Sequence, residues 1–443
     1  MNSRALAAKI IQNCLDGEGQ SHLLLRDGFR QYPELSARDR SFVTALVHGS
    51  LSEAVYLDAC LDAFSRTPVR KMKPYVRSVL RMGLFQLYFM DRVPASAVCN
   101  ESVKLIRSRM GEGLTGFVNA VLRRAAAAPR PDVEERVACS LPEALFDYLQ
   151  GLYGKDRALA IGRAFLTAPV LWGSVRQSRI SVEETVKSLK EDGFLPEEDP
   201  LLPGCIKLNR LKGEEGTDRR LEETKAVREG WLQLQDRSAQ LAVLAANPRP
   251  GMRVLDLCAA PGGKSLQAAD RMQDRGSILA CDISPARTAL IEEALSRSGF
   301  SCVKTQVADA GVFDPEKAGR FDLVIADLPC SGLGTASRKP EIKQRFSLRK
   351  VQELAALQKR LLDQAVRYVA PGGKLLFSTC TLTKEENIDN ADYLAGRAEL
   401  WPLPLALPEA LLAEKRKDRL QLFPEEGGGD GFFISLFQKG EDN

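Results

Sequence analysis

The chain has 443 residues, 44% hydrophobic and 27% charged, with a formal net charge of +4. This composition is typical of folded domains and excludes disordered, fibrous and disulfide-stapled chains. No apolar run approaches the roughly 20 residues of a membrane span, and none of the ten cysteines forms a C-x-x-C pair. Residues 1–9 also lack the apolar core of a signal peptide. We therefore expect a cytoplasmic protein with free thiols and no membrane partner.

Residues 1–130 are predicted to form an all-helical domain. Apolar side chains recur at helical spacing from Val76 to Tyr88, and again from Gly116 to Leu122. This segment holds 19 basic and 11 acidic residues, a net charge of +8, whereas the rest of the chain carries −4. A basic domain attracts RNA through its phosphates, although a solvated helical surface accounts for the same charge equally well.

Residues 131–230 are predicted to be a helical linker followed by a small α/β module. Alanines followed by Pro-Arg-Pro at 125–131 indicate a helix end and a linker. From 231 to 443, strands alternate with helices, which predicts an α/β domain with a mostly parallel, Rossmann-like sheet and a multidomain chain overall. The expected strands are 253–257, 277–282, 302–307, 321–327 and 374–379, with helices that include 264–271, 285–298 and 348–368.

The turn after the first strand of this sheet has the features of a nucleotide-cofactor loop. Its residues are Cys258, Ala259, Ala260, Pro261, Gly262, Gly263 and Lys264. The glycines allow backbone amides at the start of the next helix to approach a ligand. The loop matches neither G-x-G-x-x-G nor a Walker motif, which disfavours NAD and ATP. A glycine turn that serves helix packing alone remains the alternative.

Three aspartates follow strand ends, and in a parallel sheet these ends share one edge. Asp282 is placed to accept hydrogen bonds from two ribose hydroxyls, and Asp309 to receive an adenine amino group. A helix cap or a turn explains either aspartate equally well. Asp327 closes the apolar strand 321–327 and precedes Leu328-Pro329, so a functional carboxylate is favoured there.

Two cysteines end strands within short motifs, Asp327-Leu328-Pro329-Cys330 and Ser378-Thr379-Cys380-Thr381. A cofactor loop beside two sulfurs at neighbouring strand ends suggests carbon methylation of a pyrimidine. The attacking species would be a thiolate, whose fraction a nearby cation such as Lys264 would raise. The residues alone leave open which of Cys330 and Cys380 attacks.

The remaining cysteines and the histidines point to no further chemistry. His22 and His48 are the only histidines and lie far from the motifs, so histidine acid–base chemistry and a metal site are not expected in the C-terminal half. The thiols expected to be small core residues are Cys14, Cys60, Cys99, Cys139, Cys205, Cys281 and Cys302.

Residues 231–440 resemble the RNA cytosine-5 methyltransferases, which have a class I α/β methyltransferase domain. The blocks that carry the resemblance are 255–264, 327–335, 378–380 and 429–433. Two N-terminal segments, 91–94 and 117–123, resemble the NusB-like helical RNA-binding domain. The whole chain is therefore similar to the RsmB (Sun) type, which modifies bacterial 16S ribosomal RNA.

The resemblance implies S-adenosylmethionine as the methyl donor and RNA, not DNA, as the substrate. The residues it implies for the donor site are the 258–264 loop, Asp282, Asp309 and Asp327. It further implies that the small α/β module within 131–230 binds RNA, and we expect the protein to act as a monomer.

The resemblance also assigns roles in the reaction. Cys380 is implied as the nucleophile that adds to cytosine C6, and Cys330 as the residue that assists release of the covalent RNA adduct. Asp327 would hydrogen-bond the pyrimidine. The chain departs from the family pattern at Leu328, where alanine is common, and at 336–337, where a bulkier and more basic pair is usual. These departures affect only details of RNA contact.

The RNA target comes from the resemblance alone. For the RsmB type it is the cytosine conventionally numbered 967 of 16S RNA, reached before or during assembly of the small subunit. The same reaction on transfer RNA or on another ribosomal site is one alternative. A catalytically inactive NusB-like RNA-binding assembly factor is another, which the intact cofactor and cysteine blocks disfavour.

Overall fold

The fold is taken from a computed structural model, which describes residues 2–210, 221–412 and 417–441. The chain divides into two compact units, one formed by residues 1–168 with 335–347 and the other by 169–334 with 348–443. Within the described ranges, no helix is both long and apolar enough to cross a membrane. The finer division at 130 and 230 expected from the sequence stays a prediction.

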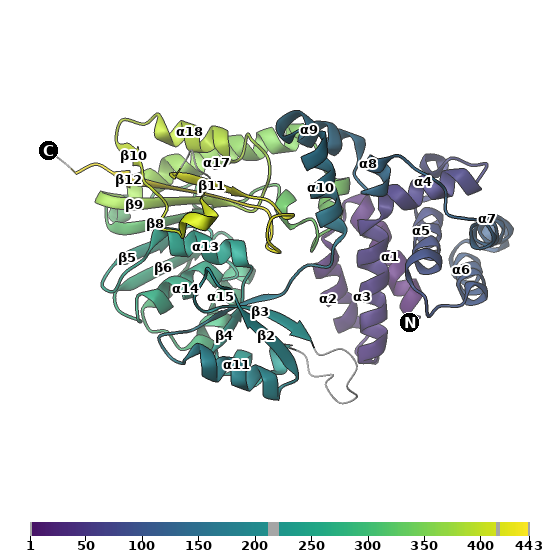
Figure 1. The fold of residues 1–443 in the computed structure, drawn as a ribbon, viewed down its shortest axis with the longest axis horizontal. Coiled ribbons are helices and arrows are strands. Elements are labelled where there is room, and N and C mark those ends of the chain that lie inside the picture. The colour runs from purple at the N-terminus through teal and green to yellow at the C-terminus, as the bar shows by residue number, and fades with distance from the viewer. Residues whose placement is uncertain (1, 211–220, 413–416, 442–443) are drawn as a thin grey trace. The chain divides into compact units, whose positions relative to one another are not determined.

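The first unit is built from helices (Figure 1). They are α1 (Ser3–Asp16), α2 (Ser21–Gln31), α3 (Ala37–Ser52), α4 (Ala54–Phe64), α5 (Pro74–Phe89), α6 (Ala95–Met110), α7 (Thr115–Ala127), α8 (Glu135–Ala138), α9 (Glu143–Tyr153), α10 (Lys155–Leu166) and α16 (Glu341–Gln344). Helix α5 packs against α1, α3, α4, α6 and α7, and buries apolar residues that include Val76, Val79, Leu80 and Leu84. The all-helical prediction for the N-terminal domain is confirmed.

The second unit contains a small antiparallel sheet in the order β2-β3-β1-β4. Its strands are β1 (Trp172–Val175), β2 (Phe194–Glu198), β3 (Cys205–Arg210) and β4 (Leu232–Leu234), accompanied by α11 (Val182–Glu191) and α12 (Lys225–Arg228). Helix α11 begins with a capping box, in which Ser181 and Glu184 satisfy each other's backbone amides. Val175, Leu189 and Phe194 belong to the core of this part.

A second sheet in this unit has the order β10-β12-β9-β8-β5-β6-β7, with β11 paired to β12. Its strands are β5 (Arg253–Asp256), β6 (Ser277–Asp282), β7 (Val303–Val307), β8 (Phe321–Asp327), β9 (Val369–Thr379), β10 (Leu400–Pro402), β11 (Arg419–Leu422) and β12 (Phe432–Lys439). Strands β5 to β9 are parallel, whereas β10, β11 and β12 pair antiparallel. The Rossmann-like prediction for this domain is confirmed.

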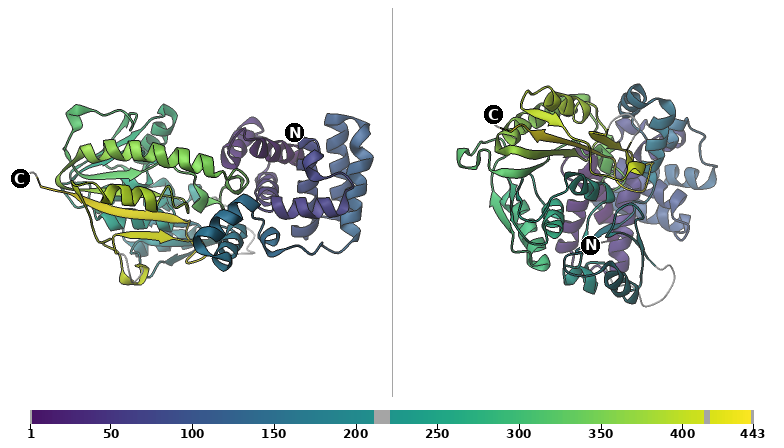
Figure 2. Two further views of the ribbon diagram at one scale, coloured as in Figure 1. Left: turned by 90° about the horizontal axis from the view of Figure 1, so that it is seen from above. Right: turned by 60° about the vertical axis from the view of Figure 1, so that its left-hand side comes forward.

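Helices cover both faces of the larger sheet, as the two views of Figure 2 show. They are α13 (Arg237–Ala246), α14 (Gly263–Arg271), α15 (Pro285–Ser298), α17 (Leu348–Tyr368) and α18 (Ile388–Ala395). Alternate residues of β8 belong to two separate cores: Leu323 and Ile325 pack with α13 to α15, and Val324 with α17 and α18. Because successive side chains of a strand point to opposite faces of the sheet, this alternation determines the face on which each side chain at a strand end lies.

The antiparallel edge was not predicted from the sequence. Strand β12 is buried along most of its length, so it lacks the alternation that marks a half-buried strand. Strand β9 also begins at Val369, earlier than the expected residue 374, because its register with β8 shifts between Phe321 and Leu323.

Candidate active site

The loop after β5 surrounds the buried carboxylate of Asp256. Ser265, in the first turn of α14, donates its hydroxyl to Asp256 Oδ2 at 2.6 Å, while Asp256 Oδ1 is buried without a hydrogen-bond partner among the described residues. Burial raises the pKa of Asp256 to about 7, although the hydrogen bond from Ser265 and the charge of Lys264 oppose this. Asp256 is therefore enclosed by the loop and ties it to the end of β5.

Gly262 gives the loop its close approach to α15. Its φ is +103°, and a Cβ at this position would lie 3.2 Å from Ile291 Cγ2. An L side chain would therefore be strained both by the backbone and by the available space. The glycine therefore serves the packing of this loop on α15.

Asp282 ties the end of β6 to the same loop. Its carboxylate accepts the amide of Ala260 at 3.3 Å and that of Ser284 at 3.2 Å, and pairs with Arg287 at 3.3 Å. Asp309 lies past β7, is exposed, and accepts the Gly311 amide at 2.8 Å. The structure thus shows turn contacts for both aspartates, and their roles toward a cofactor stay predictions.

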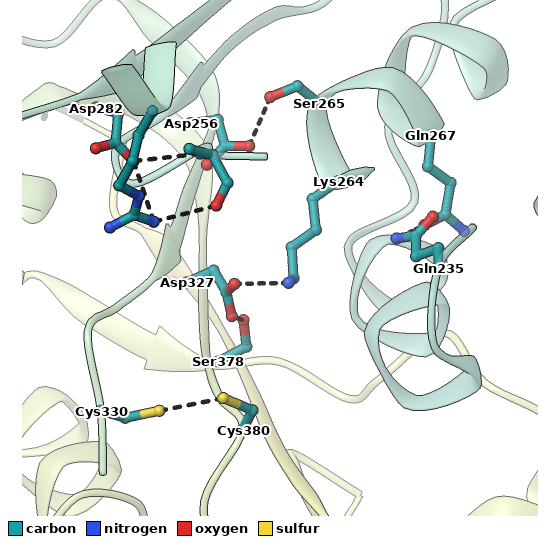
Figure 3. Close-up of polar contacts among 12 residues, drawn as sticks. Gln235, Asp256, Lys264, Ser265, Gln267, Asp282, Asp327, Cys330, Ser378 and Cys380 are labelled. Carbon is teal, nitrogen blue, oxygen red and sulfur yellow. Dashed lines mark hydrogen bonds and ion pairs between the residues drawn. The ribbon is translucent and has the colours of Figure 1, made fainter. Parts of the chain in front are cut away.

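Lys264 and Asp327 form an ion pair between the 258–264 loop and the end of β8 (Figure 3). Lys264 Nζ lies 2.6 Å from Asp327 Oδ2, and Ser378 donates its hydroxyl to Asp327 Oδ1 at 2.7 Å. Burial alone would lower the pKa of Lys264, but the charge of Asp327 and the hydrogen bond to it leave that pKa raised. The ammonium group therefore persists at neutral pH, 5.2 Å from the centre of the Phe432 ring.

The two motif cysteines meet at the carboxyl ends of β8 and β9. These strands are parallel neighbours, with Asp327 opposite Ser378, and the sulfurs of Cys330 and Cys380 lie 3.4 Å apart as free thiols. The hydrogen bond with Cys380 and then burial raise the pKa of Cys330 well above its ordinary value.

The distribution of cysteines follows the prediction from the sequence. The seven thiols expected in the core are buried, whereas Cys258, Cys330 and Cys380 are only partly so. The structure thus brings Asp327, Cys330 and Cys380 together beside the 258–264 loop at one edge of the sheet (Figure 3).

Two polar residues beside the cysteines were not predicted from the sequence. Glu386 and Asn387 lie at the start of α18 and are buried, with hydrogen bonds to the loops that carry Cys330 and Cys380. Polar residues at a helix start usually read as caps. Their position a few residues after Ser378-Thr379-Cys380 was the available signal.

Comparisons with known proteins identify the family. The model of 16S rRNA methyltransferases RsmB/F matches residues 243–438, and that of the NusB family matches residues 1–127. The probable ribosomal RNA small subunit methyltransferase B of Bacillus subtilis is 32% identical, and the alignment covers 98% of this chain and 98% of that protein. The chain belongs to the RsmB family.

Solved structures are consistent with membership of the RsmB family. The crystal structure of PH0851 covers 99% of this chain and 99% of its own, with 25% sequence identity and a TM-score of 0.81. NSun6 from Pyrococcus horikoshii, solved with SFG, covers 68% of this chain and 99% of its own with a TM-score of 0.60, and at 21% identity it shows likeness of fold. As an RsmB-family member, the chain is a ribosomal RNA methyltransferase with a NusB-type helical domain.

Proposed function

We propose that the protein transfers a methyl group from S-adenosylmethionine to C5 of a cytosine in 16S ribosomal RNA, through a covalent adduct between Cys380 and cytosine C6. The observation that carries this proposal is the pair of thiols 3.4 Å apart. They lie on adjacent strand ends, next to the Lys264–Asp327 ion pair and the 258–264 loop. Carbon methylation of a pyrimidine needs a sulfur nucleophile beside a donor site.

The residues of the loop fit the donor. The loop leads into the N-terminus of α14, whose backbone amides suit a polar ligand, and Asp282 lies at the neighbouring strand end. We assign the 258–264 loop, Asp282, Asp309 and Asp327 to the donor site. The donor supplies an electrophilic methyl group on a sulfonium centre.

The chain's own residues prepare the cytosine for this transfer. C5 is a weak nucleophile until the Cys380 thiolate adds to C6, which forms the S–C6 bond and moves electron density onto C5 and the ring amidine. Asp327 hydrogen-bonds the pyrimidine and stabilises the adduct, with Lys264 holding the carboxylate in place. C5 then takes the methyl group as the S–CH3 bond of the sulfonium breaks and its electron pair stays on that sulfur. A base removes the C5 proton, the electrons of the C5–H bond restore the C5=C6 double bond, and the S–C6 bond breaks to release Cys380 as a thiolate. Cys330, beside the departing sulfur, assists this elimination.

The substrate is inferred from the family and from the NusB-type domain. We place the target at the cytosine numbered 967, in RNA that is free or being assembled into the small subunit. The base has to be splayed from its loop, at a cost of a few kcal/mol. We propose that a monomer acts in the cytoplasm, where a reducing environment keeps Cys330 and Cys380 as thiols.

Cysteine variants test this mechanism. Cys380→Ala is expected to lower methyl transfer by roughly a factor of 10³ or more, with little change in cofactor affinity. Cys330→Ala is expected to accumulate a covalent protein–RNA complex on denaturing gels. Bisulfite mapping of 16S RNA from cells that lack the protein should locate the unmodified cytosine.

Each alternative predicts a different result. An inactive assembly factor would transfer no methyl group, either as wild type or as a variant. If the enzyme acts on a different RNA target, the mapped 16S site would still be modified in cells that lack the protein. If Cys380→Ala trapped the complex and Cys330→Ala did not, the roles of the two cysteines would be reversed.

A further inference from the structure

A buried carboxylate, Glu386, lies beside the loop that carries Cys330. Its side chain has no solvent exposure. Glu386 Oε1 accepts the Ser331 amide at 2.8 Å, and Oε2 accepts the Ser331 hydroxyl at 2.5 Å. Because Ser331 directly follows Cys330, these bonds fix the backbone next to that sulfur.

The residue before Cys330 is held by the same group of side chains. Gln358, on α17, donates through Nε2 to Glu386 Oε1 at 3.1 Å and to the carbonyl of Pro329 at 2.9 Å. Gln358 is itself completely buried. Both chain neighbours of Cys330 are therefore connected to one carboxylate.

Glu386 also reaches the loop that carries Cys380. The hydroxyls of Ser331 and Thr381 lie 2.6 Å apart. Because the Ser331 hydrogen goes to Glu386, Thr381 is the donor in this pair. Thr383 donates to Glu386 Oε2 at 2.6 Å. The two cysteine loops are thus joined through a shared hydrogen-bond network.

The next residue, Asn387, contacts the Cys380 loop directly. Asn387 Oδ1 accepts the Thr379 hydroxyl at 2.5 Å, and Nδ2 donates to the Thr381 carbonyl at 3.0 Å. Asn387 therefore contacts both chain neighbours of Cys380. Of these two adjacent residues, Glu386 is hydrogen-bonded mainly to the Cys330 loop and Asn387 to the Cys380 loop.

The charge of Glu386 acts on Cys330 as well. After the hydrogen bond with Cys380 and burial, the charges of Cys380 and Glu386 contribute to the raised pKa of Cys330. Burial raises the pKa of Glu386 itself, while hydrogen bonds from Ser331 and Thr383 oppose that shift. The donors around both carboxylate oxygens favour the ionised form. An ionised Glu386 thus adds a smaller contribution to the raised pKa of Cys330, after the Cys380 hydrogen bond and burial.

We propose that Glu386 is a positioning residue, which holds Cys330 against Cys380 for the release of methylated RNA. The proposal rests on the proposed function, because it assigns Glu386 to the release step of that reaction. Without the carboxylate, the Ser331 amide and the Gln358 side chain lose a buried hydrogen-bond acceptor. The Cys330 loop is then free to move, while Asn387 still holds Cys380.

The first experiment compares Glu386→Ala with Asp389→Asn in the full chain. Asp389 lies in the first turn of α18, three residues after Glu386, and forms a half-exposed ion pair with Lys384 at 2.5 Å, so its variant controls for perturbation of α18. Glu386→Ala is expected to lower turnover about 10- to 100-fold, with the KM for RNA within about threefold of wild type. Covalent protein–RNA complex should accumulate, as for Cys330→Ala, whereas Asp389→Asn should behave as wild type.

A second experiment needs no RNA. N-ethylmaleimide labelling of Cys330, followed by peptide mass spectrometry, reports both its exposure and its thiolate fraction. Losing Glu386 should raise both, so labelling is expected to be about tenfold faster in Glu386→Ala. Asp389→Asn should be unchanged. Glu386→Gln, which keeps one acceptor oxygen but no charge, should fall between the wild type and the alanine variant.

The results separate this proposal from the proposed function. Unchanged labelling of Cys330 in a folded Glu386→Ala protein would overturn the positioning role, whatever the RNA assays give. Faster labelling without trapped complex would overturn the role in release if Cys330→Ala does trap RNA. If neither variant traps RNA, the release step assigned to Cys330 fails, and with it the catalytic part of this inference.

Discussion

At the scale of single residues, the thiol pair makes the site sensitive to oxidation. Cys330 and Cys380 lie 3.4 Å apart and form no disulfide. A two-electron oxidant such as diamide would remove one hydrogen from each thiol, form an S–S bond and become the corresponding hydrazine. The bond would occupy the proposed nucleophile and its partner at once.

We therefore expect diamide to abolish methyl transfer and dithiothreitol to restore it. Peptide mapping of the oxidised protein should find a cross-link between Cys330 and Cys380, and cofactor affinity should change little. Cys330→Ala should form no such cross-link. Full activity in protein that carries the mapped cross-link would contradict the nucleophilic role of Cys380.

At the scale of elements, the sequence predicted the strand ends of the site well. The bounds of β6 and β8 match the predicted ranges, and the meeting of Cys330 with Cys380 follows from two parallel strands lying side by side. Local patterns define such strands because their apolar runs end at a polar residue. The network of Glu386 and Asn387 depends on how α18 packs, which no local pattern specifies.

Local sequence patterns also do not specify the placement of helix α16. It follows the 327–335 motif in the chain but belongs to the helical unit. There Lys343 is completely buried and donates to the Ser52 carbonyl at 2.9 Å. Burial lowers its pKa to about 8 from the ordinary value of 10.5. Between these values the unfolded chain binds more protons than the folded one, so this residue makes stability rise with pH in that window.

The Lys343→Met variant should remove that contribution. We expect the urea midpoint of the wild type, relative to the variant, to rise between pH 7 and pH 10, because the cost of burying the charge is relieved as Lys343 loses its proton. Comparing the two proteins at each pH cancels the other titrating groups. A midpoint difference that stays constant, or that falls as the pH rises, would contradict a buried ammonium at this position.

At the scale of the whole molecule, part of the positive charge of the first 130 residues lies in one short exposed segment. Between α4 and α5 the chain exposes a basic segment, with Arg70, Lys71 and Lys73 within a few residues of one another. An exposed cluster of this kind suits the phosphates of RNA. Evenly spread charge would instead be an ordinary solvated surface.

Replacing Arg70, Lys71 and Lys73 with glutamine together should weaken RNA binding and flatten its salt dependence, because each lost phosphate contact removes roughly 0.7 to 0.9 from the slope of log affinity against log salt. The residues proposed for the donor site belong to the other unit, so S-adenosylmethionine affinity measured by calorimetry should be unchanged. The control is a triple variant in which exposed Lys9, Arg30 and Arg38 are each replaced with glutamine. It removes the same charge, but from three separate helices. Equal salt slopes for the two triple variants would show that only net charge matters and that the α4–α5 segment is not an RNA contact.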